Sequence, residues 1–548
     1  MLQRRKMFQF AGVAAAAAAG GGAWMYYGAS GASRSSAMAR EPFRHYPFDP
    51  VALDNFKQKL FIPVGSGPFG VLDVAGPLKI RATAASFAFM PGGESPFLLY
   101  QTEQAGKAYQ NPILRVQSGA RFTASLHNEL KEPTIIYWHG LHTPAAMDGH
   151  PASTIEPGAK YDYDFTVRNR GGTYWYHTHA HNLTAKQAYN GLASFLLVDD
   201  DDQRSINKAL DLQLGVTDLP LVVQDKQFDG EGKLVYKPGM HEAMMGWLGD
   251  IVLANLTANA VQTVTPRTYR LRLLNGSNAR IYRLAFVKGD TLLNFTVIGT
   301  DGGLIERPET VAEAFFAPGE RLDVLIDAGQ AQSGEAIFLR SLAFDAMENE
   351  GSAGGASGMG GMGGMGGMGS SRLPLGVEFN ILKLQVTDGE RIVPRLPAVL
   401  SVVRPIDWAG AFERKVELSM GQMRFLINGR TFKMDEVAFD VKRGAVEIWR
   451  ISNPALGMPH PMHIHGFSFQ VLERIGSPPQ VAATARFGKG RTVSDLGWKD
   501  TVLVWPGETV RIAIDFAHNY PGSQTYVFHC HNLEHEDASM MINFRVLA

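Results

Sequence analysis

One cysteine in a chain of 548 residues constrains this sequence more than any other feature. Cys530 forms no internal disulfide, and it lies between His529 and His531, with His535 and Met540 following closely. A thiolate, two imidazoles and a long axial thioether are the ligands of a blue-copper electron-transfer site, because soft sulfur donors together with imidazole favour copper. Cys530, His535 and Met540 supply three of these four groups.

The strand geometry expected around Cys530 adds a second metal site. If residues 526–531 are extended, His529 and His531 project to the face opposite Cys530, since side chains alternate along a strand. One short strand would then connect two metal sites.

Three further histidine clusters lie upstream. The stretch His460-Pro-Met-His463-Ile-His465 offers the missing fourth ligand of the blue-copper site. The other two clusters are Tyr137-Trp138-His139-Gly140 and Trp175-Tyr176-His177-Thr178-His179. Histidines two residues apart on a strand point both rings to one face, so each pair can reach into a shared cleft.

These residues, in this order, resemble the multicopper oxidases, the laccase-like enzymes that pass electrons from a blue copper to a three-copper cluster that reduces dioxygen to water. The resemblance runs from about residue 50 to the end of the sequence. Within the family, the chain looks most like the bacterial copper efflux oxidases, in the stretches Met147-Asp148-Gly149, Leu274-Asn275-Gly276, Thr300-Asp301-Gly302-Gly303 and Leu533-Glu534-His535-Glu536-Asp537.

The resemblance implies ligands for up to four copper ions. The blue copper would take His460, Cys530, His535 and Met540. The paired coppers of the cluster would take His139, His177, His179, His465, His529 and His531. The third, mononuclear copper of the cluster would take His463.

The first histidine cluster departs from the family pattern. Family members read His-x-His-Gly, whereas this chain has Tyr137 where a second ligand of the mononuclear copper is expected. Alternation keeps Tyr137 on the face of His139, so it points at the cluster. Three alternatives are open: Tyr137 binds the metal, His142 replaces it, or the third copper is weakly held or absent. His142 lies beyond a glycine, which makes it the least favoured.

Two carboxylates suit proton delivery to dioxygen during its reduction. Asp148 follows the first histidine cluster, and Glu536 is next to His535. Both match acids that lie beside the cluster in the family. The alternative is that both are plain surface acids.

The pattern of strands predicts an all-β protein of three cupredoxin-like Greek-key β-sandwich domains. Short runs rich in β-branched and aromatic residues alternate with Gly, Pro and Asn turns, and no helical period is sustained. We predict a signal peptide at residues 1–39 and domains at 40–200, 201–372 and 373–548, with the blue-copper site in the third domain. The cluster would lie between the first and third domains.

A segment rich in glycine and methionine occupies residues 351–371 at the end of the second domain. Glycine at this density predicts a mobile surface loop, because little apolar area can be buried against its ordering entropy. Thioethers are soft ligands that select cuprous copper, so the segment could collect that ion. The alternative is low-complexity drift in a tolerant loop.

The N-terminal residues predict export. Paired arginines, Arg4 and Arg5, precede a weakly apolar run and an Ala-x-Ala site at Ala37 and Ala39, which is typical of a cleaved twin-arginine signal. The alternative is a retained membrane anchor. We expect a periplasmic protein without stable membrane insertion after signal removal. The net charge of −1 gives no reason to expect nucleic acid as a partner.

The sequence therefore predicts an exported copper-dependent oxidase that couples one-electron oxidation of Cu(I) or of phenolic and aromatic donors to reduction of dioxygen to water. One alternative is a copper-binding or electron-carrying protein in which Tyr137 impairs oxygen reduction. Another is the cell-division relative of the family, which keeps the fold without coppers; it loses the ligand histidines, and this chain keeps them.

Overall fold

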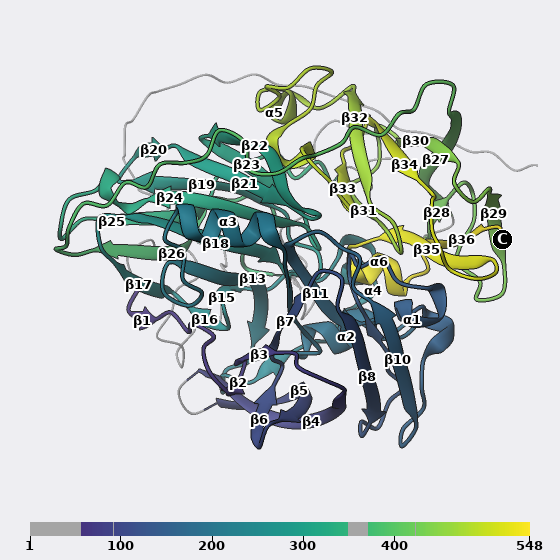
Figure 1. Ribbon diagram of the computed structural model, residues 1–548, viewed down its shortest axis with the longest axis horizontal. Helices are drawn as coiled ribbons and strands as arrows, with labels where there is room; N and C mark the ends of the chain where they lie inside the picture. The colour runs from purple at the N-terminus through teal and green to yellow at the C-terminus, as the bar shows by residue number, and fades with distance from the viewer. Residues whose placement is uncertain (1–55, 91–92, 349–370, 422–423) are drawn as a thin grey trace, which may run out of the picture. The chain divides into compact units, whose positions relative to one another are not determined.

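The computed structural model describes residues 56–90, 93–348, 371–421 and 424–548. The predicted signal peptide and residues 351–370 of the Gly/Met-rich segment lie outside these residues. The described residues are mostly strands, as predicted, and they form six sheets. Three separate clusters of buried apolar residues divide the sheets into three packed pairs (Figure 1).

The first pair of sheets carries two of the histidine clusters. Its six-stranded sheet has the order β10 (Lys160–Thr166), β8 (Arg121–Asn128), β4 (Leu78–Met90), β5 (Gly93–Gln104), β6 (Lys107–Gln110) and β2 (Gly67–Pro68). Its five-stranded sheet has the order β3 (Val71–Asp73), β7 (Ile113–Gln117), β12 (Ala193–Asp199), β11 (Gly172–Thr178) and β9 (Ile136–Tyr137). Phe122, Ala124 and Leu126 alternate along β8 and face the core, which explains why this stretch is a strand.

Among the described residues of the second pair of sheets, none belongs to a group of histidines that could hold a metal ion. One sheet has the order β1 (Gln58–Lys59), β17 (Ala260–Val264), β26 (Phe379–Val386), β25 (Ala336–Ser341), β19 (Tyr282–Lys288) and β20 (Thr291–Leu293), with β23 (Glu313–Phe316) also on β19. The other has the order β16 (Thr257–Ala258), β15 (Ile251–Ala254), β13 (Asp218–Phe228), β18 (Thr268–Asn275), β24 (Arg321–Asp327), β21 (Phe295–Thr300) and β22 (Gly303–Val311), with β14 (Leu234–Val235) on β13.

Two strands join the second pair of sheets from outside its expected range. β26 follows the Gly/Met-rich segment, yet it pairs with β17 and β25, and β1 at residues 58–59 pairs with β17. The strands of the third pair begin only at residue 412. We therefore propose moving the start of the third domain from residue 373 to the stretch between 387 and 411.

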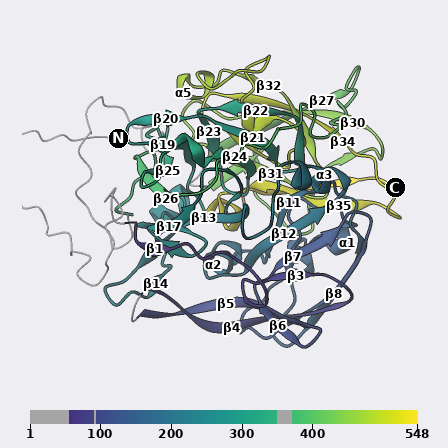
Figure 2. The same ribbon diagram turned by 60° about the vertical axis from the view of Figure 1, so that its left-hand side comes forward.

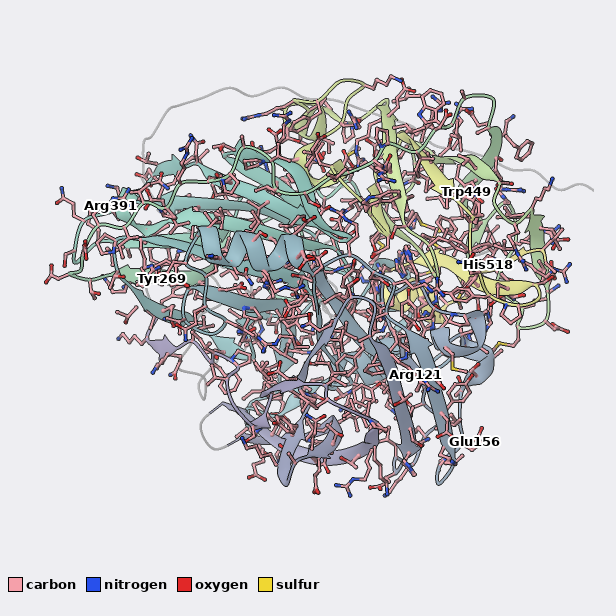
Figure 3. The ribbon with its side chains drawn as sticks, viewed as in Figure 1. Arg121, Glu156, Tyr269, Arg391, Trp449 and His518 are labelled. Carbon is pink, nitrogen blue, oxygen red and sulfur yellow. The ribbon has the colours of Figure 1, made fainter. Side chains whose placement is uncertain are left out.

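The third pair of sheets carries the cysteine. One sheet has the order β28 (Arg424–Ile427), β27 (Phe412–Gly421), β30 (Val446–Ser452), β34 (Thr509–Asp515) and β32 (Phe469–Ile475). The other has the order β29 (Val437–Val441), β36 (Met541–Val546), β35 (Gln524–Cys530), β31 (His460–Ile464) and β33 (Thr501–Val504). Trp449 lies fully buried on β30 in the core between them (Figure 3).

The helices are short and connect strands. They are α1 (Ala145–Asp148), α2 (Thr184–Tyr189), α3 (Asp201–Ala209), α4 (Met240–Met245), α5 (Pro479–Ala482) and α6 (Leu533–Asp537). Both α2 and α4 pack against α6, so segments of all three sheet pairs meet beside the end of β35 (Figure 1). α1 also contacts β35, and the two lie near each other in Figures 1 and 2. Within the described ranges, no helix combines the length and apolar character needed to cross a membrane.

A buried lysine beneath this junction gives a testable pH dependence. Burial lowers the pKa of Lys226 to about 7, and its ammonium lies 4.0 Å from the centre of the Tyr189 ring. Above pH 7 the folded lysine is neutral while the unfolded one keeps its proton up to its ordinary pKa of about 10.4. Unfolding then takes up a proton, so the free energy of unfolding should rise with pH by about 1.4 kcal/mol per unit on account of this group.

The matched measurement compares the wild type with Lys226→Met between pH 7 and 9. The difference between their free energies of unfolding in urea should change by about 1.4 kcal/mol per pH unit, because the methionine does not titrate. A constant difference across this range would contradict the lowered pKa of Lys226.

Candidate metal centre

β35 delivers its cysteine and its histidines to different sites. It pairs with β31, and this register places Met462 opposite Cys530 and His463 opposite His529. Cys530 joins one group of potential ligands, while His529 and His531 join two others. The strand therefore reaches three separate groups, which agrees with the alternation expected from the sequence.

The sulfur group contains three of the four donors expected for the blue copper. Sγ of Cys530 lies 3.5 Å from Nδ1 of His460 and 3.5 Å from Nδ1 of His535. The Nε2–H of His535 donates to the carbonyl of Met244 at 2.9 Å. Its Nδ1, which faces Sγ of Cys530, is therefore unprotonated and keeps its lone pair. Met540 is fully buried in the same core, and its carbonyl accepts from the backbone N–H of Cys530.

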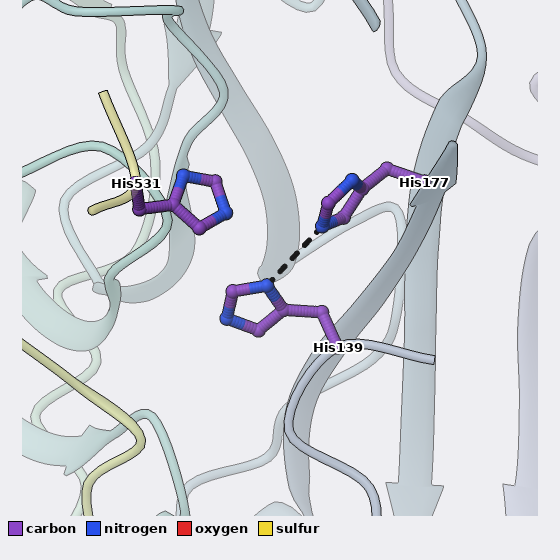
Figure 4. Close-up of side chains that lie close together, drawn as sticks. All are labelled: His139, His177 and His531. Atoms are coloured by element: carbon purple, nitrogen blue, oxygen red, sulfur yellow. Dashed lines mark hydrogen bonds between the residues drawn. The ribbon is translucent and has the colours of Figure 1, made fainter. Parts of the chain in front are cut away.

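A second group consists of His139, His177 and His531, whose rings point toward a common space (Figure 4). Nδ1 of His139 lies 3.3 Å from Nε2 of His177, and the Nδ1–H of His177 donates to the carbonyl of Thr178 at 2.7 Å. Neither ring nitrogen of the buried His531 has a hydrogen-bond partner among the described residues. A buried imidazole without partners is costly, and a metal ion in this space would satisfy it.

The third group consists of His179, His465 and His529. Their Nε2 atoms converge, at 3.1 Å between His465 and His529 and 3.4 Å between His179 and His529. The Nδ1–H of His529 donates to the carbonyl of Cys530, and that of His465 donates to Asp148. The Nε2 atoms of His465 and His529 are therefore both unprotonated, and their lone pairs face each other. A cation between them would stabilise this arrangement.

Burial favours the neutral form, which is the form that binds metal, in seven of the imidazoles of these groups. It lowers the pKa of His177 and of His535 to about 3. Burial also lowers the pKa values of the other imidazoles well below the ordinary value, and these are His139, His179, His460, His465 and His531. The donor sets of all three groups thus fit copper.

Tyr137 lies among these rings and is fully buried. Its hydroxyl lies 2.7 Å from Nε2 of His463, and its ring stacks on His465 with 3.7 Å between centroids. Burial raises the pKa of Tyr137 well above its ordinary value, and the nearby Asp148 and Asp500 add to this effect. His142, the other candidate for this position, belongs to none of the ligand groups, and its Nε2 lies 2.9 Å from Oγ of Ser468.

Asp148 and Glu536 are buried, so the surface alternative for these acids is wrong. Oδ2 of Asp148 accepts from Nδ1 of His465 at 2.7 Å, and burial raises the pKa of Asp148 well above its ordinary value. The carboxylate of Glu536 lies 3.3 Å from Nδ1 of His529 and 3.5 Å from Nδ1 of His179. Both acids therefore contact imidazoles of the third group.

A buried carboxylate beside the histidine groups was not predicted from the sequence. Oδ1 of Asp500 lies 3.1 Å from Nε2 of His139 and 3.4 Å from Nδ1 of His463. Although burial acts to raise it, the ion pair with Arg321 holds the pKa of Asp500 well below its ordinary value. No motif or spacing marks Asp500 and Arg321, which come from separate sheet pairs.

A short helix with three methionines was also not predicted as part of the site, although these methionines are visible in the sequence. α4 reads Met-His-Glu-Ala-Met-Met, and Met244 and Met245 pack against the core that holds Cys530. Met240 is 74% exposed. The helix thus presents thioethers between solvent and His535.

Comparison with known proteins gives matches along most of the chain. Family models described as multicopper oxidase match residues 101–203, 175–352 and 394–548. A laccase of Bacillus subtilis (strain 168) is 31% identical over 455 residues, which are 76% of this chain and 80% of the laccase. The cell division protein FtsP of Sodalis glossinidius (strain morsitans) is 32% identical over 432 residues, 78% of this chain and 81% of FtsP.

Among solved structures, the multicopper oxidase McoA of the hyperthermophile Aquifex aeolicus is 39% identical and superposes with a TM-score of 0.78. The match covers 90% of this chain and 100% of McoA. The three pairs of sheets are thus three cupredoxin-like domains, as the sequence predicted. Together with the histidine and cysteine groups, these matches place the chain in the multicopper oxidase family, as a copper-dependent oxidoreductase with dioxygen as its electron acceptor.

Proposed function

We propose that the protein is an exported oxidase that takes single electrons from Cu(I) or from phenolic and aromatic donors and reduces dioxygen to water. The blue copper would be held by His460, Cys530, His535 and Met540. The copper pair would be held by His139, His177, His179, His465, His529 and His531. Copper bound at these groups would accept electrons from the donor and transfer them to dioxygen.

The observation that carries this proposal is the position of Cys530 on β35. Its sulfur belongs to the group whose His535 is hydrogen-bonded to Met244 of α4, and its two neighbours in the chain, His529 and His531, belong to the two groups of the pair. An electron leaving the thiolate would cross only the backbone of adjacent residues to reach either imidazole. The strand therefore supports transfer from a donor site to an oxygen site within one molecule.

The methionines of α4 support Cu(I) as the preferred donor. The exposed Met240 offers a thioether on the same short helix as Met244, whose carbonyl orients His535, and thioethers select cuprous copper. The Gly/Met-rich segment at 351–371 could collect the ion, which would make the protein a copper-tolerance enzyme. Phenolic donors would make it a laccase.

The test is donor oxidation by the purified, copper-loaded protein. An intense blue absorption and oxygen uptake with Cu(I), in a ratio of four donor electrons per dioxygen, are expected, with a higher kcat/KM for Cu(I) than for a phenol. A colourless protein, or donor oxidation without oxygen uptake, would contradict the oxidase. A higher kcat/KM for the phenol would show that aromatic compounds, and not Cu(I), are the preferred donors.

Export would depend on Arg4 and Arg5. We expect the protein in the periplasmic fraction of the bacterial cell, and in the cytoplasm when both arginines are replaced by lysine, because paired arginines mark the signal for folded export. Unchanged location of the lysine variant would refute this route.

Asp148 and Glu536 would deliver protons to dioxygen during its reduction. Replacing Asp148 with asparagine keeps an acceptor for Nδ1 of His465 but removes the transferable proton. We expect oxygen reduction to slow by about 10²–10⁴-fold while the blue absorption stays. The control is Glu156→Gln, a change at an exposed acid of the same domain (Figure 3). Equal oxygen-reduction rates in Asp148→Asn and wild type would exclude Asp148 from proton delivery.

A second candidate function is a copper-binding or electron-carrying protein with impaired oxygen reduction. The hydroxyl of Tyr137, at 2.7 Å from Nε2 of His463, favours it, because that nitrogen would otherwise bind the mononuclear copper. Such a protein would oxidise its donor only until its coppers were reduced. Oxygen uptake that continues over many donor equivalents would exclude this function.

A further inference from the structure

The third copper of the cluster lacks a fitting donor set in this chain. The Nδ1–H of His463 donates to the carbonyl of Asp500 at 2.8 Å, so Nε2 carries the lone pair, and this lone pair accepts the hydroxyl of Tyr137. The remaining group of potential ligands, His139, His463 and Asp500, places Nε2 of His139 and Nδ1 of His463 around one carboxylate. That carboxylate already pairs with Arg321 and His139, so the group has its polar partners without a metal.

Three groups that fit copper hold three ions, which store three electrons. Dioxygen takes up four electrons and four protons when it forms two water molecules. An enzyme with three coppers therefore needs one further electron, either from another group of the protein at once or from a later delivery by the donor, if water is to be its product.

Tyr137 is placed to supply that electron. Its ring stacks on His465 at an interplanar angle of 10°, and it meets the rings of His177 and His179 edge-on with 5.4 Å between centroids. The phenol therefore touches imidazoles from both groups of the copper pair. It is 0% exposed, so an oxidised ring would be shielded from solvent and from external reductants.

A phenol that loses an electron also needs a base for its proton, and His463 provides one. The hydrogen bond from Tyr137 to Nε2 of His463 is 2.7 Å long. In the imidazolium that would form, the Nδ1–H still donates to the carbonyl of Asp500. The same Nδ1 lies 3.4 Å from Oδ1 of the Asp500 carboxylate. The negative charge of Asp500 would stabilise it.

On these contacts, and resting on the proposed oxidase function, we propose that Tyr137 is a catalytic residue that supplies the fourth electron for reduction of dioxygen. In this step the O–H bond of Tyr137 breaks, its proton forms the N–H bond at Nε2 of His463, and its electron completes the cleavage of the O–O bond. Three electrons come from the metal ions, and all four protons taken up by dioxygen come from solvent through acids such as Asp148 and Glu536, because the proton of Tyr137 stays on His463. The next electron from the donor, arriving through Cys530, reduces the phenoxyl radical, and His463 returns the proton.

The test combines copper counting with rapid-freeze electron paramagnetic resonance. The fully reduced, copper-loaded protein is mixed with dioxygen and frozen within milliseconds. The wild type should hold three coppers per chain and develop an organic radical signal whose line shape changes when the protein contains ring-deuterated tyrosine. Tyr137→Phe, which keeps the stacked ring, should hold the same copper and keep the blue absorption, yet lose the radical and release hydrogen peroxide in place of water. The matched control is Tyr282→Phe, a buried tyrosine of the second domain, which should keep the radical.

Tyr137→His tests binding of the mononuclear copper separately from electron supply by the phenol, because it restores the family motif. This variant should bind a fourth copper with a mononuclear Cu(II) signal and form water without a radical. Four coppers in the wild type, or water formed by the wild type and Tyr137→Phe alike without a radical, would overturn the role of Tyr137 while leaving the oxidase intact. A wild type that consumes no dioxygen would instead refute the proposed function, and the inference with it.

Discussion

Cys530→Ser is expected to remove the blue absorption and to reduce donor oxidation to the level of the copper-free protein. In the proposed assignment the thiolate of Cys530 is the soft ligand that defines the site, and a serine hydroxyl is a hard, protonated group that does not replace it. Loss of a partner outside the ligand shell typically costs about 10–100-fold in metal affinity or activity, so loss of the ligand itself should cost more. The measurements are visible absorption, copper content, which should fall by one ion per chain, and donor turnover.

The matched control is Met540→Leu, which keeps volume and burial but removes the thioether proposed as the axial ligand. This variant should keep its blue colour, because the axial ligand is weak and mainly tunes the redox potential. The copper pair should remain in both variants, since His529 and His531 are unchanged. A serine variant with the wild-type spectrum and turnover would refute the assignment of Cys530 and, with it, the electron path along β35.

Arg321→Met is expected to destabilise the protein by about 3–5 kcal/mol, because it leaves the buried carboxylate of Asp500 without its partner. The guanidinium of Arg321 is fully buried and donates to Asp500, to the carbonyl of Thr173 at 3.1 Å, to that of Asp301 at 3.1 Å and to that of Gly319 at 2.7 Å. These partners belong to all three domains. Urea unfolding of the copper-free protein measures the loss.

A comparison with an exposed ion pair isolates the effect of burial. Arg391 makes two hydrogen bonds of 2.6 Å to Asp327, and both side chains are partly exposed (Figure 3). Arg391→Met should cost only about 0–1 kcal/mol, as exposed pairs usually do. Similar losses in the two variants would show that the contacts of Arg321 between domains add no stability.

The sequence predicted the parts of the site that local rules determine. Ligand identity follows from residue chemistry, and alternation along a strand was enough to separate Cys530 from His529 and His531. The predicted domain boundary at 373 does not match the sheet pairing, because β26 pairs with strands of the second domain. The residues of β26 have the pattern of an ordinary strand, and this pattern does not determine which sheet the strand joins. Strand pairing depends on contacts with residues far away in the chain.

Asp500 shows a different limit. Its role depends on Arg321, His139 and His463, which come from three domains, so no window of the sequence contains the site. The burial of Asp148 and Glu536 has the same cause, because an acid on a short helix reads as exposed until another domain covers it. Tyr137 was visible as a departure from the family motif, but only the contact with His463 indicated what the phenol could do.

The convergence of His179 and His529 has a consequence for biosynthesis. These two imidazoles are 350 residues apart in the chain. At about 5–20 residues per second, the ribosome completes the second of them roughly 20–70 s after the first. A copper ion arriving in that interval would meet at most two of the three ligands of this group, His179 and His465 without His529. Metal loading must therefore follow the docking of the third domain on the first.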